Sequence, residues 1–303
     1  LGEGALAAVG SVSILYNLLT GFFNGLTLGF SIVTARYFGA GDTEKLKKSV
    51  AGTILLGFVT AAILVIGVFV FLRPLLSIMH VPAEQKEMAY TYISILVLGM
   101  FVTLAYNMCA NVLRAIGDSM TPLIFLILAA VLNVILDYVC ILVFSMGVGG
   151  AAAATVISQV VSVALCVIHI KRHFPILQVE RRHFKLEKSE VRTMLSGGLS
   201  MGMMSSLVNL GTLILQTGIN TLGTSVIVAH TAARKVFEIW GLPVTVLGAT
   251  MATYSGQNYG AGKYDRITSG LKAALMLGCG WAVMVMIMAY TISTCLVGFI
   301  AST

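Results

Sequence analysis

The sequence predicts an all-α integral membrane protein of parallel six-helix repeats, a twelve-helix, two-lobe architecture of which eight helices are present. Three observations predict this fold class: an apolar composition, long segments without charge, and an internal repeat. Of the 303 residues, 58% are hydrophobic and 10% are charged, whereas soluble domains are about 25% charged. This composition excludes an ordinary water-soluble domain, because too few charged residues remain to cover its surface.

Long uncharged segments supply the predicted membrane-spanning helices. Residues 5–35, 88–113, 147–168 and 273–303 contain no Asp, Glu, Lys or Arg, and about 20 apolar residues suffice to cross the hydrocarbon core. The segments lack the alternation over about ten residues that marks barrel strands. In chain order, the eight predicted spans are 8–37, 49–73, 88–114, 120–145, 148–170, 194–220, 225–257 and 270–300.

The basic residues between the spans indicate the orientation. Of the 19 Lys and Arg residues, 15 lie at one set of span ends, and the other four are Arg73, Lys86, Arg234 and Lys235. Because basic loops stay in the cytoplasm, the set of 15 is expected there, in a multi-pass protein of a bacterial-type inner membrane. The net charge of +7 is then a sign of topology, and no nucleic-acid partner is expected.

An internal repeat relates the first and seventh spans. Residues 34–46 read TARYFGAGDTEKL and residues 255–267 read SGQNYGAGKYDRI, an offset of 221 positions without a gap. Six spans separate the copies, so both have the same orientation, as in transporters built from parallel repeats. The glycines of the two GAG segments are predicted to end helices in the left-handed conformation: Gly39, Gly41, Gly260 and Gly262.

The repeat divides the chain into three parts. Residues 1–173 are expected to form an amino-terminal lobe that lacks its first helix, residues 174–192 a basic cytoplasmic linker, and residues 193–303 the first three helices of a truncated carboxy-terminal lobe. Three histidines in or beside the linker have basic neighbours but no metal-ligand spacing, and are expected to be solvated or to contact lipid headgroups: His169, His173 and His183.

Asp137 is the one acidic residue deep inside a span of the first lobe. Intramembrane carboxylates are costly and often functional. Asn133 lies one helical turn earlier, and Thr155 follows the turn at residues 147–150 at a similar depth. A carboxylate, an amide and a hydroxyl can therefore converge to bind a hard cation, or to hold a proton on the carboxylate. The alternative is a structural Asp that is hydrogen-bonded between helices.

Polar residues of the second lobe suggest a substrate cavity. Glu238 in the seventh span corresponds to Asn17 by the repeat offset, and Lys235 lies three residues before Glu238. The two charged residues could line a central cavity or form an ion pair near the outer interface. Gln216 and Met204 of the sixth span complete the candidates, since methionine suits promiscuous surfaces but also packs helices.

Four sequence features together resemble those of the multidrug and toxic compound extrusion (MATE) family. Their residues are most similar to those of its DinF-like branch. The GAG segment occurs twice, and GQN precedes the second copy. Residues 113–122 read LRAIGDSMTP, like the family's loop between its fourth and fifth helices. Asn133 and Asp137 are followed by GVGGAAAAT at residues 147–155. The resemblance covers nearly the whole chain, placed as family helices two to nine.

The resemblance implies a secondary active antiporter, which exports organic compounds, cationic or amphipathic, in exchange for sodium ions or protons by alternating access. Asn133, Asp137 and Thr155 match the family's cation site in the amino-terminal lobe, where an aspartate on the first helix joins them. An acid that some relatives carry in the seventh family helix has no counterpart, because residues 194–220 contain no acid. Coupling is therefore expected in the first lobe.

Two other functions compete with this interpretation of the same residues. A flippase or exporter of lipid-linked or polysaccharide precursors, in the same superfamily, would use Arg234 and Lys235 to bind an anionic headgroup. A membrane-embedded enzyme would need paired catalytic groups at one depth, and the spans offer none, with His230 at an outer end. We expect no cofactor, a monomer, and the bilayer and small organic solutes as partners.

Overall fold

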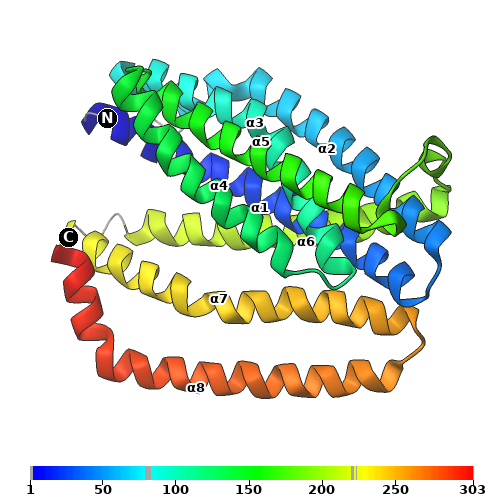
Figure 1. Cartoon of the computed structure of the whole chain (residues 1–303). Helices are drawn as coiled ribbons and strands as arrows, with labels where there is room; N and C mark the ends of the chain where they lie inside the picture. Colours follow the sequence, from blue (N-terminus) through cyan, green and yellow to red (C-terminus); the bar gives the residue numbers. More distant parts are fainter. Residues whose placement is uncertain (1–2, 79–82, 220–221, 223, 303) are drawn as a thin grey trace.

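The computed structural model describes residues 3–78, 83–219, 222 and 224–302, and shows a bundle of long helices (Figure 1). Its helices are α1 (Glu3–Gly39), α2 (Thr43–Ile78), α3 (Ala83–Ala115), α4 (Met120–Tyr138), α5 (Gly147–His173), α6 (Lys188–Ile219), α7 (Thr224–Gly260) and α8 (Tyr264–Ser302). Three short elements join them: the π-helix η1 (Val139–Val143) and the 3-10 helices η2 (Pro175–Leu177) and η3 (Arg181–Phe184). Over the described residues, eight helices are long and apolar enough to span a membrane, which confirms the predicted all-α membrane fold.

The helices extend beyond the predicted spans by several residues at most ends. The largest differences at a start are in α2, α6 and α8, which begin at Thr43, Lys188 and Tyr264 instead of residues 49, 194 and 270. Hydropathy detects only the part of a helix that lies in hydrocarbon, whereas backbone hydrogen bonding continues into the charged residues at the interface. The first turns of α6 therefore occupy the end of the predicted linker.

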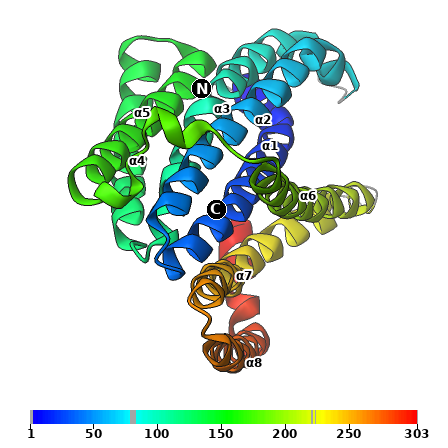
Figure 2. The same cartoon turned by 90° about the vertical axis from the view of Figure 1, so that its right-hand side faces the viewer.

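Helix α1 lies at the centre of the bundle and packs against α2, α3, α6 and α7. Figure 2 shows α4 and α5 on one side of it and α7 and α8 on another. Helix α8 packs only against α7 within the described part of the chain. Exposed hydrophobic side chains are numerous on the outer helices, up to 86% exposed at Tyr290 of α8, as expected for surfaces that face lipid.

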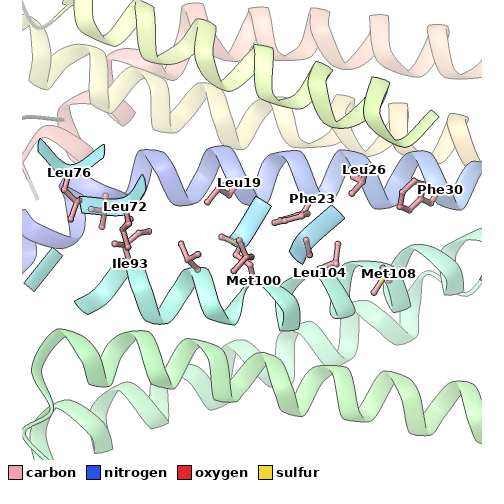
Figure 3. Close-up of a cluster of buried hydrophobic side chains, with 14 of the residues drawn as sticks. Leu19, Phe23, Leu26, Phe30, Leu72, Leu76, Ile93, Met100, Leu104 and Met108 are labelled. Atoms are coloured by element: carbon pink, nitrogen blue, oxygen red, sulfur yellow. The ribbon is translucent and has the colours of Figure 1, made fainter. Parts of the chain in front are cut away.

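The main core joins α1, α2 and α3. Phe23 and Phe30 of α1 are completely buried in one cluster with Leu72 of α2 and with Ile93 and Met100 of α3 (Figure 3). Met194 of α6 is buried in the same cluster. Close side-chain packing thus holds the first lobe together, and α6 packs against α1 of this lobe.

The turns after α1 and α7 have the same structure, which supports the repeat. Three backbone hydrogen bonds recur at the offset of 221, for example Ala40 N–H to Arg36 O and Ala261 N–H to Gln257 O, both at 3.0 Å. Gly41 and Gly262 have positive φ angles of 70° and 68°, so the prediction for these two glycines is confirmed. Both helices contain 37 residues, and in Figure 1 they run in the same direction.

The prediction for Gly39 and Gly260 was wrong, because neither has a positive φ angle and each is the last residue of its helix. They allow a close approach of α1 and α7 instead. A Cβ atom on Gly39 would overlap the carbonyl oxygen of Gln257, and one on Gly260 would overlap the carbonyl oxygen of Arg36. These two contacts are related by the repeat. We call this side of the bundle, where α1 and α7 end and α2 and α8 begin, the basic end.

Further contacts join the helices at the basic end. The Gln257 side chain donates a hydrogen bond from Nε2 to the Ala115 carbonyl oxygen of α3 at 2.8 Å. The Arg36 guanidinium lies 4.8 Å from the centre of the Tyr259 ring, a distance at which cation–π attraction operates. Helix α7 is therefore held against both α1 and α3 at this end.

An aspartate caps α2 at the basic end. Oδ1 of Asp42 accepts a hydrogen bond from the Lys45 backbone N–H at 3.0 Å. This hydrogen bond lowers the pKa of the Asp42 carboxyl, and the Lys45 ammonium, 3.3 Å from Oδ2, acts in the same direction. Asp118 caps α4 in the same way, by accepting from the Thr121 N–H at 3.1 Å.

The expectation that His183 is solvated was wrong. Its side chain is 0% exposed, where η3 packs against α2. Nδ1 accepts a hydrogen bond from the Glu180 backbone N–H at 2.8 Å, and Nε2 lies 3.4 Å from Oε1 of Glu44. Leu177 of η2 is also buried, in a cluster with Leu46 of α2. The segment after α5 is therefore folded onto the first lobe and is not a free linker.

We expect that replacing His183 with Ala loosens this segment, because the Glu180 N–H loses its acceptor and a buried ring is removed. A lost partner of this kind costs about 1 kcal/mol or more, so trypsin should cut at Arg181 and Arg182 about fivefold faster. The measurement is the cleavage rate in membrane fragments that are open on both faces. His173→Ala, at an exposed position, is the control, and equal rates for the two variants would contradict a structural role for His183.

Candidate functional site

The polar set predicted for the first lobe lies between α4 and α5. Nδ2 of Asn133 is 3.4 Å from Oγ1 of Thr155, a long and weak hydrogen bond. Thr155 donates its own hydroxyl proton to the Ala151 carbonyl oxygen at 3.0 Å. The two helices are joined by the turn before Gly147 and pack against each other. The structure thus brings Asn133 and Thr155 together.

Asp137 lies one turn after Asn133 on α4 and is half-buried. Its Oδ1 atom is shielded from solvent and has no hydrogen-bond partner among the described residues. A buried carboxylate oxygen without a donor is unfavourable unless a proton or a cation occupies the site. The neighbouring amide and hydroxyl oxygens of Asn133 and Thr155 are hard ligands that suit such a cation.

The π-helix η1 begins two residues after Asp137, at Val139. Single π turns are uncommon and occur often at functional sites, because they shift the side chains on one face of a helix. The predicted span over residues 120–145 gave no sign of this irregularity. It places a change in helical geometry directly beside the carboxylate.

Two tyrosines near Asp137 were not predicted from the sequence. The Tyr92 hydroxyl of α3 interacts electrostatically with both Asp137 and Tyr16 of α1. Both tyrosines are partly buried against the main core. A phenol can donate a hydrogen bond to a carboxylate or offer its oxygen to a cation. Tyr92 therefore adds a group from α3 to the surroundings of the carboxylate, in addition to the polar groups of α4 and α5.

Other buried hydrogen bonds connect the same helices. Thr103 of α3 donates to Oε1 of Gln159 on α5 at 2.6 Å. Closer to the basic end, Asn111 of α3 donates from Nδ2 to Thr27 of α1 at 2.9 Å, and Arg114 donates to Oδ1 of Asn111 at 2.9 Å. These contacts fix α1 and α5 against α3.

A cavity of about 330 Å³ lies between the two lobes, within the volume range of ligand sites. We call it the interlobe pocket, and its lining residues are Asn17 and Leu18 of α1, Asn209, Thr212, Leu213 and Gln216 of α6, and Thr231, Arg234, Lys235 and Glu238 of α7. The structure thus gathers four of the five residues predicted for a substrate cavity, which are Asn17, Gln216, Lys235 and Glu238. Met204 is not among the lining residues, and its side chain is 57% exposed on α6.

The ion pair between Lys235 and Glu238, one of the two alternatives for these residues, does not form. Glu238 accepts a hydrogen bond from Nε of Arg234 at 2.8 Å instead. Residues four apart on a helix lie more directly above one another than residues three apart in this orientation, and the guanidinium offers several donors to a carboxylate. Lys235 has no ion pair or hydrogen bond with any residue in the described part of the chain.

The comparison with known families decides the assignment. A family model described as MatE matches residues 1–139 and 201–303. The chain belongs to the MatE family. This confirms the resemblance drawn from the GAG repeat and the Asn133 and Asp137 segment. The family consists of transporters, which agrees with the prediction of a transporter rather than an enzyme.

Individual MatE relatives are similar over most of this chain. The "Probable multidrug resistance protein YoeA" of Bacillus subtilis (strain 168) is 28% identical over 284 residues, which cover 91% of this chain and 61% of the relative. The "FAD transporter" of Shewanella oneidensis is 24% identical over 285 residues, covering 91% and 62%. The chain thus spans about three fifths of the length of the curated relatives that it matches.

A solved structure, "Crystal structure of MATE in the bent conformation", has the same fold. It aligns with a TM-score of 0.87 at 23% identity, over 100% of this chain and 69% of the solved one. The fold of this MatE chain is therefore that of a two-lobed transporter, and the residues discussed above lie on helices that this fold uses.

Proposed function

We propose that the protein containing this chain is a secondary antiporter, which exports small organic solutes from the cytoplasm in exchange for sodium ions or protons. The observation that carries the proposal is Asp137: a carboxylate inside a membrane span, with Oδ1 buried and without a donor, beside the side chains of Asn133 and Thr155. Such a group requires a positive charge or a proton. It is therefore suited to bind the entering ion.

Either ion fits the chemistry of this set. A sodium ion would use the carboxylate, the Asn133 amide oxygen and the Thr155 hydroxyl as hard oxygen ligands. A proton would need only the carboxylate, with Tyr92 nearby to interact with it. In both cases the ion is cargo that enters with its gradient, and the chain requires no resident metal or cofactor.

Coupling requires that the ion favours one arrangement of the lobes over the other. In the present arrangement, α1 and α7 are in contact at the basic end, and the interlobe pocket lies in the opposite half of α7. Helix α1 links the two regions, because Tyr16 interacts with Tyr92 beside Asp137 and Asn17 lines the pocket. We infer that the ion at Asp137 shifts α1, and that solute and ion weaken each other's binding by the same factor.

The names of the relatives support an exporter of organic compounds. Relatives are named as multidrug resistance or multidrug export proteins, and one as a FAD transporter. With 15 of 19 basic residues at the basic end, we propose that this end lies in the cytoplasm of an inner-membrane protein that works as a monomer. The interlobe pocket would then release its solute on the outer side.

A second function, that of a lipid-precursor flippase, is also supported by a specific observation. Arg234 and Lys235 line the interlobe pocket, as the headgroup site of a lipid-precursor flippase would require. A flippase would move a labelled anionic lipid between leaflets, whereas an exporter would clear a water-soluble compound from the cell. The two functions are distinguished by which of these cargoes follows an imposed ion gradient.

The direct test is export by the full-length protein from a bacterial host that lacks its own exporters. Cells are loaded with a fluorescent organic dye, and sodium and pH gradients are imposed separately. We expect efflux at least about fivefold above the vector control under one gradient, which identifies the coupled ion. If no dye leaves faster than from control cells under either gradient, at normal abundance in the membrane, the proposal is overturned.

A further inference from the structure

We propose that the interlobe pocket binds an anionic group of its organic solute through Lys235 and the free end of Arg234. Carboxylates, sulfonates or phosphates on an amphipathic molecule would then be preferred over organic cations. The inference rests on the proposed transport function, since it assigns a substrate class to the pocket of that transporter. It departs from one of the two solute classes that the family resemblance implies, the organic cation, and keeps the other, an amphipathic compound.

The charges that line the pocket determine whether it prefers an anionic or a cationic ligand. Arg234, Lys235 and Glu238 are the charged lining residues, which sum to one positive charge. The single carboxylate, on Glu238, is already paired with Arg234 at 2.8 Å. An organic cation would therefore meet an acid whose charge is satisfied, together with a lysine that repels it. An anion would meet an ammonium group and a guanidinium.

Both basic side chains keep donors for a ligand. Lys235 is exposed and has no ion pair or hydrogen bond with the residues that the structure describes. Arg234 uses Nε for Glu238, and its two terminal amino groups make no hydrogen bond within the described part of the chain. Terminal guanidinium groups and a neighbouring ammonium form strong, charge-assisted hydrogen bonds with carboxylate or phosphate oxygens.

The remaining lining suits a molecule with both polar and apolar parts. Leu18 of α1 and Leu213 of α6 provide apolar surface, while Asn17 and Thr212 provide groups that donate or accept hydrogen bonds. The volume of about 330 Å³ is at the small end of the range for drug-sized ligands. One anionic group on a ring system of moderate size fits this combination.

The experiment measures binding of two dyes with the same three-ring scaffold but opposite charge. Fluorescein is anionic, and a rhodamine ester is cationic. The purified full-length protein is placed in nanodiscs of neutral phosphatidylcholine, without any gradient, and dye affinity is read from fluorescence anisotropy. The variants are Lys235→Gln, Lys235→Arg and Glu238→Gln, and Lys263→Gln at the basic end is the matched control because it also removes one lysine outside the pocket.

We expect the wild-type protein to bind fluorescein more tightly than rhodamine. Lys235→Gln should weaken fluorescein binding about tenfold or more, since a charge-assisted hydrogen bond is lost, while Lys235→Arg and Lys263→Gln retain it. Glu238→Gln should strengthen fluorescein binding several-fold, because Arg234 is released from its partner. The proposal is overturned if rhodamine binds more tightly, if neither dye binds, or if Lys235→Gln and Glu238→Gln leave both affinities unchanged.

Anionic groups can come from soluble compounds or from lipid headgroups, so a second set of nanodiscs contains phosphatidylglycerol. If this lipid weakens fluorescein binding to the wild type but not the residual binding to Lys235→Gln, the headgroup also occupies the pocket. If it has no effect, the site takes soluble anions. Because binding is measured without a gradient, a protein that binds fluorescein but exports nothing would refute the transport function and leave the pocket assignment standing.

Discussion

Replacing Asp137 with Asn is expected to reduce gradient-driven export at least about tenfold, and to remove its dependence on the coupled ion. Asn has nearly the same shape as Asp but cannot carry the charge that attracts a cation, nor can it be protonated. The binding of one coupled ligand typically changes the affinity for the other about 5–150-fold. Asp137→Asn should lose this effect, because it no longer binds the ion. The measurement is the initial efflux rate, normalised to the amount of protein in the membrane.

The matched control for this variant is Glu87→Gln, which neutralises an exposed acid on the first turns of α3. It removes one negative charge without touching the Asn133 and Thr155 set. We expect it to export like the wild type. Full, gradient-dependent export by Asp137→Asn would show that the ion binds elsewhere, and the second-lobe acid Glu238 would then be the next position to examine.

Leucine at Gly39 or Gly260 is expected to reduce export by a similar factor, for a different reason. Each added Cβ atom would overlap a backbone carbonyl oxygen of the opposite helix, and backbone cannot move aside as a flexible side chain can. The ends of α1 and α7 at the basic end could then no longer meet. Because alternating access needs both arrangements, a carrier that cannot close this end should stop cycling.

The readout for this prediction is both transport and the distance between the helices. With the native cysteines replaced, Arg36→Cys and Tyr259→Cys should be joined by a short bifunctional maleimide, and Gly39→Leu or Gly260→Leu should reduce that cross-linking. Gly67→Leu and Gly248→Leu are controls, because a Cβ atom at either glycine has no neighbour within 4 Å. Normal export and cross-linking in the Gly39 and Gly260 variants would show that this contact plays no part in the cycle.

Much of the fold followed from the sequence because its signals are local. Uncharged segments of sufficient length determine where helices cross the bilayer, and all eight were found. Counting residues on either side of the turn at Gly147 placed Asp137 and Thr155 at a similar depth, with Asn133 one helical turn from Asp137. The structure brings Asn133 within 3.4 Å of Thr155. The offset of 221 positions likewise predicted that α1 and α7 are equivalent.

What the sequence did not reveal depends on contacts between distant segments. Tyr92 interacts electrostatically with Asp137 and with Tyr16, but only the packing of helices that are distant in the sequence brings these residues together. His183 lies among basic residues, a pattern typical of a solvated loop, yet it is buried because the 3-10 helix η3 packs against α2. Gly39 and Gly260 have the sequence of helix ends, and only the crossing of two helices gives them a second role.

The most direct test of coupled antiport uses the purified full-length protein in sealed proteoliposomes, with fluorescein and a rhodamine ester as cargo and no nucleotide present. A sodium or proton gradient is imposed across vesicles with equal dye on both sides. We expect one dye to become concentrated on one side of the membrane while the ion moves the opposite way, and we expect Asp137→Asn to show neither movement. Dye that stays at equal concentration under both gradients, in vesicles shown to contain folded protein, would contradict coupled antiport.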